Sequence, residues 1–265
     1  MMVGPRNPNS VTTDMRKRCT VFLRTLMKMI RLDMYAIQCE HCNLLTPLFF
    51  SWHSPTLLVD GTAEDVSFLI DFLPAYLFPT DSRSVHAWGV AGKSLGGHSA
   101  WLALAHGKCA STWTLKQLTT GEDKRVKFGV PIIACPDYLK LMQARAMRYS
   151  VSTEPPHFPA RLIETVAHKD PSTTPYDRLD ATNPFLGKKI LVMSGAADKL
   201  VPWEASRDFV ERLEVGPGGV KKTVLLAEVG HKCTDSMLEA LGRFVGKEYL
   251  WNWLQIKLYY ISCET

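Results

Sequence analysis

Short apolar runs alternate with amphipathic stretches from about residue 55 to residue 248. Runs that are almost continuously hydrophobic are typical of strands buried on both faces of a sheet. Four runs predict such strands, at 84–92, 125–135, 188–195 and 221–230. Helices are predicted after three of them, over 100–106, 203–213 and 236–245. Strands and helices in this alternation predict an α/β fold with a mostly parallel sheet and helices on both faces.

One more helix is predicted before the first strand. Thr62 is a suitable N-cap, and Pro74 and Pro79 are expected to end the helix. Apolar residues follow the cap at helical spacing, namely Val66, Leu69, Ile70 and Leu73.

The strand–helix alternation is lost in one long segment, residues 137–183, which is rich in Pro, Met, Tyr and His. A long irregular insertion in a compact domain is usually a lid or a binding segment. We therefore expect a lid here, and its apolar residues Met142, Phe158 and Leu162 are the candidates for contact with a substrate.

Composition and charge exclude some classes of protein. The chain has 265 residues with 46% hydrophobic and 22% charged content, which fits one large globular domain. No apolar run approaches the ~20 residues that a membrane-spanning helix needs. Residues 1–31 hold seven basic residues and one acid, so they account for more than the whole formal charge of +5. The remaining body is close to neutral, which argues against nucleic-acid binding.

The basic N-terminus and the cysteines indicate in which cellular compartment the protein is expected. An Arg-rich, acid-poor leader is either a mitochondrial presequence or a solvated extension. Seven cysteines, without a secretory signal, indicate free thiols and a reducing compartment. We therefore expect a cytoplasmic protein, with the mitochondrion as the alternative. Cys39 and Cys42 have the spacing of metal ligands, but no second ligand pair appears, so no metal or other cofactor is expected.

The candidate chemistry begins at the sequence Gly92-Lys93-Ser94-Leu95-Gly96, which fits the pattern G-x-S-x-G. This spacing suits a sharp strand-to-helix turn that exposes the serine oxygen and needs small neighbours. The same turn directs the amide of Leu95 towards a developing oxyanion. The pattern arises by chance in about one chain in ten of this length, so its place between a predicted strand and a predicted helix carries the weight.

A serine nucleophile needs a base, and the base needs an acid that orients it. Asp198 directly follows the third predicted strand, and His231 follows the fourth. Strand ends meet at one edge of a parallel sheet, so the order Ser94, Asp198, His231 suits a catalytic triad. Asp198 could instead cap the turn before Pro202, and His231 could be an ordinary loop histidine.

The sequences "GKSLGGHSAW", "SGAADKLVP" and "VGHKC", in this order, resemble the α/β-hydrolase superfamily, and in particular small esterases of the dienelactone-hydrolase and prolyl-oligopeptidase type. The resemblance covers residues 55 to about 248. It implies a serine hydrolase without a cofactor, acting on a small acyl ester or thioester. In that reaction Ser94 attacks the acyl carbon, His231 shuttles the proton, Asp198 holds His231, and Leu95 offers one oxyanion amide.

The N-terminal quarter departs from this pattern. The superfamily carries its first strands and a second oxyanion donor there, yet no glycine occurs between Gly4 and Gly61. We expect three parts: an atypical segment 1–54 that is either helical or leaves the sheet incomplete, a hydrolase core 55–250, and a tail 251–265 that could form a homodimer face. The second oxyanion donor stays unassigned. A non-catalytic or impaired binding module is therefore the alternative function.

Overall fold

The computed structural model describes residues 50–80, 85, 87–106 and 125–251. All of these belong to one compact unit, Thr46–Thr265. The predictions for residues 1–49, which include Cys39 and Cys42, and for the tail 252–265 lie outside the described residues.

The sheet has four parallel strands in the order in which they occur in the chain. They are β1 (Trp88–Lys93), β2 (Val126–Ile132), β3 (Lys189–Gly195) and β4 (Val220–Leu226). Nearly every residue of β3 is buried, as its continuous apolar sequence requires. The predicted parallel sheet is confirmed, and each predicted strand overlaps an observed one.

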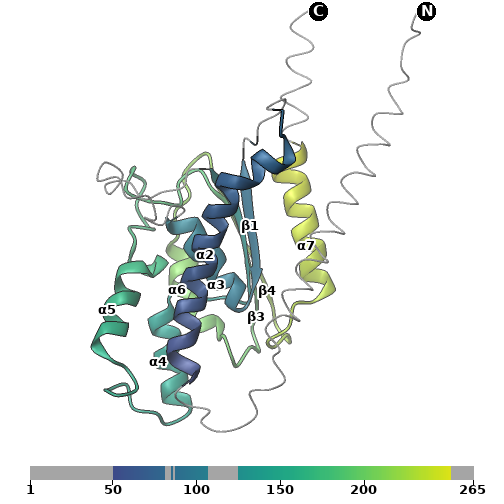
Figure 1. The fold of residues 1–265 in the computed structure, drawn as a ribbon. Helices are drawn as coiled ribbons and strands as arrows, with labels where there is room; N and C mark the ends of the chain where they lie inside the picture. The colour runs from purple at the N-terminus through teal and green to yellow at the C-terminus, as the bar shows by residue number, and fades with distance from the viewer. Residues whose placement is uncertain (1–49, 81–84, 86, 107–124, 252–265) are drawn as a thin grey trace, which may run out of the picture. The chain divides into compact units, whose positions relative to one another are not determined.

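Helices follow or flank these strands. They are α2 (Phe50–Leu77), α3 (Leu95–His106), α4 (Tyr138–Arg148), α5 (Ala160–Lys169), α6 (Trp203–Arg212) and α7 (Asp235–Val245), with a 3₁₀ turn at Pro171–Thr173 and a π-helical stretch at Gly246–Trp251. Figure 1 shows α7 on one side of the strands and α2, α3 and α6 on the other. Helices therefore cover both faces of the sheet, as the sequence predicts.

The main core lies between the sheet and the helices α3 and α6. Trp101, Phe185 and Phe209 form its centre, with edge-to-face contacts at ring-centroid distances of 5.3 to 6.1 Å. Leu104, at 0% exposure, packs in the same cluster. Edge-to-face aromatic pairs contribute about 0.5–1.5 kcal/mol beyond the burial of their area, so this cluster is expected to anchor the elements that carry the site.

Two details of the first predicted helix are wrong. Helix α2 begins at Phe50 rather than after Thr62, and it continues past Pro74 to Leu77. Proline removes one backbone donor from the helical ladder, and Pro74 lies in the last turn, so one hydrogen bond is lost and the helix ends soon after, at Leu77. Val66 and Ile70 also pack against the main core, and this tertiary contact stabilises the helix that surrounds them.

The segment 137–183 is more regular than predicted, because it contains α4 and α5. Asp137 caps α4 by accepting the Lys140 N–H at 2.9 Å. Helix α4 then buries Leu141 and Ala146 in a second core cluster. The expected irregular insertion is thus a helical unit, and whether it acts as a lid stays a prediction.

Candidate active site

Ser94 lies on a one-residue turn between β1 and α3. Its φ of 54° falls in the left-handed region, which a serine adopts only under constraint. The Ser94 N–H donates to the carbonyl oxygen of Ile132 at 2.9 Å and so ties the turn to the end of β2. A Cβ on Gly92 would lie 2.1 Å from the carbonyl oxygen of Gly96, so only glycine fits there.

The serine, the histidine and the acid form a continuous chain of hydrogen bonds. Ser94 Oγ lies 2.9 Å from His231 Nε2, and His231 Nδ1 lies 2.8 Å from Asp198 Oδ2. Because a carboxylate only accepts, Nδ1 of a neutral His231 carries the proton, and Nε2 is left to accept from Ser94. The structure therefore brings together the three residues that the sequence analysis selected from three separate motifs.

Asp198 is the most enclosed member of the three. Its side chain is 0% exposed, whereas that of His231 is 24% exposed. Its second oxygen, Oδ1, accepts the Leu200 N–H at 2.8 Å and the Val201 N–H at 3.0 Å. Burial of a carboxylate costs free energy unless such donors are present. The two hydrogen bonds also fix the orientation of the Asp198 carboxylate group.

The loops that carry Asp198 and His231 touch through their backbones. The Ala197 N–H donates to the carbonyl oxygen of Val229 at 3.1 Å. A Cβ on Gly195 would lie only 2.1 Å from that same oxygen. A glycine at the end of β3 thus allows the two loops to approach closely.

A second histidine, His98, lies one helical turn beyond Ser94 on α3, but it serves the scaffold. Its Nδ1 lies 2.8 Å from the carbonyl oxygen and 3.0 Å from the amide nitrogen of Cys135. Burial lowers the pKa of His98 to about 4, so its imidazole is neutral near pH 7. Burial likewise raises the pKa of Cys135 to about 12, which keeps this cysteine a thiol. Neither competes with His231 or Ser94.

A small pocket of about 60 Å³ opens beside His98. Its lining is mostly apolar and includes Leu102 and Val166. The buried carboxyl of Asp170 also lines it and accepts the Tyr138 N–H at 2.7 Å. Burial and the nearby Asp137 carboxylate raise the pKa of Asp170 to about 8. Sequence reasoning missed this pocket, because its residues come from distant parts of the chain.

The three predicted substrate-binding residues lie in the segment 137–183. Met142 and Phe158 are buried in the second core cluster. Leu162 lies on α5 and is half-buried. None of the three lines the pocket, and their contact with a substrate stays a prediction.

A turn that exposes a serine after β1, an acid after β3 and a histidine after β4 meet at one edge of a parallel sheet. The chain has an α/β-hydrolase fold. Within the described ranges, no group of three or more His, Cys, Asp or Glu side chains could hold a metal ion. No helix in the same residues is both long and apolar enough to cross a bilayer.

Neither a protein-family model nor a curated protein matches the sequence. Solved structures do match the chain. SOBER1 of Arabidopsis thaliana is 13% identical with a TM-score of 0.41, over 72% of this chain and 64% of that one. Acetyl xylan esterase 1 of Thermoanaerobacterium sp. is 14% identical with a TM-score of 0.46, over 71% and 51%. The Pyrococcus furiosus esterase Pf2001 is 21% identical with a TM-score of 0.43, over 72% and 63%.

The chain therefore spans less than two thirds of the length of each of these structures. They assign no role to any residue of this chain. The site rests on the contacts of the chain itself.

Proposed function

We propose that this chain is a serine hydrolase that cleaves a carboxylic ester or thioester through an acyl-enzyme on Ser94. The observation that carries the proposal is the unbroken chain of hydrogen bonds from Ser94 Oγ through the imidazole of His231 to Asp198. Nothing in the packing of the core requires these three polar groups to meet, whereas activation of a serine requires all of them.

The geometry supports the following sequence of steps. Ser94 Oγ attacks the acyl carbon while His231 Nε2 takes its proton, and Asp198 stabilises the imidazolium that forms. The leaving alcohol or thiol then receives that proton from His231 as its bond to the acyl carbon breaks. Water, deprotonated by His231, next attacks the acyl-enzyme. His231 then returns that proton to Ser94 Oγ as its bond to the acyl carbon breaks, which releases the acid and restores Ser94.

Leu95 is the proposed donor to the negative oxygen of the tetrahedral intermediate. It is the first residue of α3, where a helix leaves its N–H groups without intrahelical partners. The end of the helix also carries a partial positive charge. A second donor is unassigned, and loss of one oxyanion donor lowers turnover about 10²–10³-fold. This gap is the observation that favours the alternative, a binding module of the same fold whose serine is idle.

Labelling with a fluorophosphonate separates the two functions, because the probe phosphonylates only an activated serine. We expect the native chain to be labelled, and Ser94→Ala and His231→Ala to lose the label. Ser152→Ala and His168→Ala, which change an exposed serine and an exposed histidine, are matched controls that keep it. A folded native chain that takes up no label would contradict the hydrolase proposal and favour the binding module. A panel of neutral and charged short-chain esters and thioesters then defines the substrate.

A further inference from the structure

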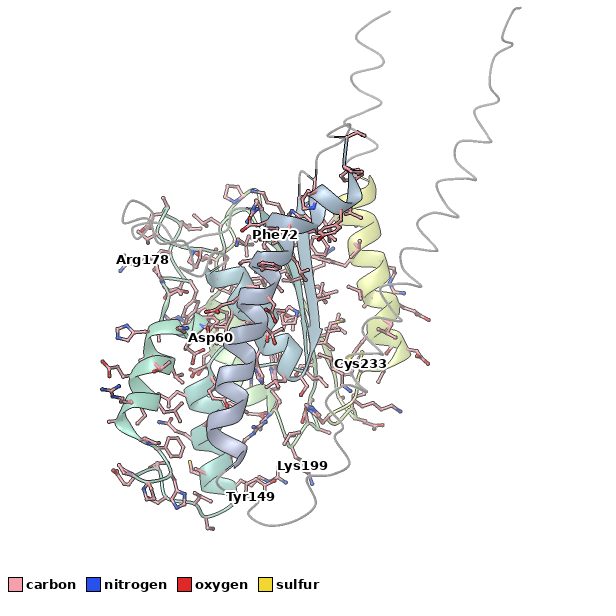
Figure 2. The ribbon with its side chains drawn as sticks, in the orientation of Figure 1. Asp60, Phe72, Tyr149, Arg178, Lys199 and Cys233 are labelled. Atoms are coloured by element: carbon pink, nitrogen blue, oxygen red, sulfur yellow. The ribbon has the colours of Figure 1, made fainter. Side chains whose placement is uncertain are left out.

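The loop after β3, which carries Asp198, is held from outside by two arginines of α4. Arg145 donates from Nε and from one Nη to the carbonyl oxygen of Leu200, at 3.0 and 2.9 Å. Arg148 donates from Nη1 to the carbonyl oxygen of Lys199 at 2.7 Å. Figure 2 shows Tyr149, the residue after α4, at the same end of the described structure as Lys199.

These carbonyls belong to the two peptide groups whose amides bind the acid. The peptide between Lys199 and Leu200 accepts from Arg148 at its oxygen and donates to Asp198 Oδ1 at its nitrogen. The peptide between Leu200 and Val201 accepts from Arg145 and donates to the same oxygen of Asp198. In a trans peptide the C=O and N–H groups point in opposite directions. Each peptide is therefore held between a guanidinium on one side and the carboxylate on the other.

This arrangement fixes the acid more strongly than its own loop could. Hydrogen bonds in a chain polarise one another, and those with a charged partner are the strongest. Arg145 makes two bonds and is half-buried, whereas Arg148 makes one and is exposed. Arg145 is thus the stronger of the two supports, and its positive charge partly offsets the buried charge of Asp198.

Helix α4 is itself a firm base for these arginines. The carboxylate of Asp137 caps its first turn. Leu141, Met142 and Ala146 bury its inner face in the second core cluster. The arginines therefore extend from a packed helix, which transmits its fixed position to the acid loop.

We propose that Arg145 is a positioning residue for Asp198, and that α4 supports the acid of the active site instead of merely covering it. The inference rests on the proposed function, since it assigns Asp198 the role of orienting His231. It also makes a geometric claim, that the hydrogen bond between His231 Nδ1 and Asp198 Oδ2 depends on Arg145.

The test compares Arg145→Met, Arg145→Lys and Arg148→Met, with Arg207→Met as a control at an exposed arginine of α6. Proton NMR reads the low-field resonance of the His231 Nδ1–H, identified by its loss in His231→Ala. Fluorophosphonate labelling and ester turnover give rates for the same variants, and near-UV circular dichroism establishes that each has folded.

We expect the low-field resonance to be lost or broadened in Arg145→Met, retained with less change in Arg148→Met, and unaltered in Arg207→Met. The labelling rate should fall about 10–100-fold in Arg145→Met, the range seen when a residue that orients a metal ligand is removed. The loss should appear in kcat with KM nearly unchanged, and added guanidinium ion at a non-denaturing concentration should restore part of it. If Arg145→Met does not fold, Arg145→Lys replaces it, with an intermediate loss because a lysine ammonium lacks the planar pair of N–H groups that both reach the Leu200 oxygen.

A folded Arg145→Met chain with an intact low-field resonance overturns the positioning role, whatever its labelling rate. If the variants show the expected resonance changes but the native chain takes no label, the positioning of Asp198 is supported and the hydrolase function is contradicted. The two failures are therefore distinguishable.

Discussion

The turn at Ser94 and the loop at Asp198 are two regions of one site, and they are fixed by different means. The turn is held by backbone sterics, because Gly92 and Gly97 lie where any side chain would meet neighbouring atoms. The loop is held by side chains, since Asp198 accepts from the loop's amides and Arg145 of α4 donates to the carbonyl oxygen of Leu200.

This difference predicts how each region fails. Steric fixation acts through a few closely placed atoms, so one added methyl group is enough to disturb the turn. Fixation by hydrogen bonds is distributed, so the loop depends on residues far away in the sequence, and loss of a single donor weakens it by degrees. Four further experiments challenge or refine this contrast.

The largest effect is expected from Asp198→Asn. The amide has about the same shape, but its NH₂ group cannot accept, so it cannot satisfy His231 Nδ1–H and the loop amides together. We expect the labelling rate to fall on the order of 10⁴-fold with the fold retained. Asp208→Asn, at an exposed acid on α6, is the matched control and should label at the native rate. A small loss in Asp198→Asn would mean that the acid is not required.

Gly92→Ala tests the steric side of the comparison. The new Cβ would lie 2.1 Å from the Gly96 carbonyl oxygen and 2.9 Å from the Gly97 nitrogen, so the turn must shift. We expect at least a ~100-fold loss of labelling, and a free energy of unfolding lower by about 2–4 kcal/mol in urea denaturation. Gly242→Ala is the control, since its Cβ meets nothing within 4 Å on α7. It should stabilise the helix by about 0.5–1 kcal/mol. Normal labelling of Gly92→Ala would show that the turn is not sterically fixed.

The pH dependence of stability tests how firmly α4 is seated, because the carboxyl of Asp170 binds the Tyr138 N–H at the start of this helix. The folded-state pKa of Asp170, about 8, is above its ordinary value of 3.8. Between these two pH values the folded chain retains a proton that the unfolded chain has lost. The free energy of unfolding that this proton contributes is therefore lost as pH rises from 3.8 to about 8. Asp170→Asn should remove that dependence.

Denaturation at pH 5 and pH 8.5 measures it. We expect the free energy of unfolding of the native chain to decrease from pH 5 to pH 8.5, relative to that of Asp170→Asn. The comparison with the variant matters because buried His98, with its pKa lowered to about 4, destabilises the fold in the opposite direction, as pH falls below 6.5. Parallel curves for the native chain and Asp170→Asn would show that Asp170 ionises normally.

The smallest effect is expected from Lys221→Met, which removes a lysine that binds backbone carbonyl oxygens far from Asp198. Lys221 Nζ donates to the carbonyl oxygens of Val210, Glu211 and Leu213 at the end of α6, at 2.7 to 2.9 Å. Its loss should lower the free energy of unfolding by about 1 kcal/mol and leave the labelling rate unchanged. Lys127→Met, at an exposed residue of β2, is the control. A large loss of labelling in Lys221→Met would mean that side chains which bind backbone carbonyls affect the site even when they do not contact the acid loop.

The residues of the triad could be located from the sequence because each directly follows an apolar strand or lies on a local motif. The prediction of Ser94, Asp198 and His231 required only one rule about tertiary structure, that parallel strands end at one edge of the sheet. Their catalytic roles stay predictions until labelling tests them.

The supports of the site could not be located in this way. Arg145 and Leu200 are 55 residues apart, and nothing in either local sequence indicates their contact. The limits of α2 were misjudged for a similar reason, since the burial of Ile70 against a distant core outweighs the local effect of Pro74. The capping of α4 by Asp137 could have been found, because an aspartate precedes apolar residues at helical spacing.

The close approach of Gly195 to Val229 has a consequence for building chimeric enzymes. The backbones of the acid loop and the histidine loop are in direct contact, so main-chain atoms set the distance between the two loops at this point, while Arg145 and the loop amides orient the acid. Residues 195–231 should therefore be exchanged between related chains as one unit, together with the arginine of α4 that binds the acid loop. A swap of either loop alone would place a foreign backbone against that contact.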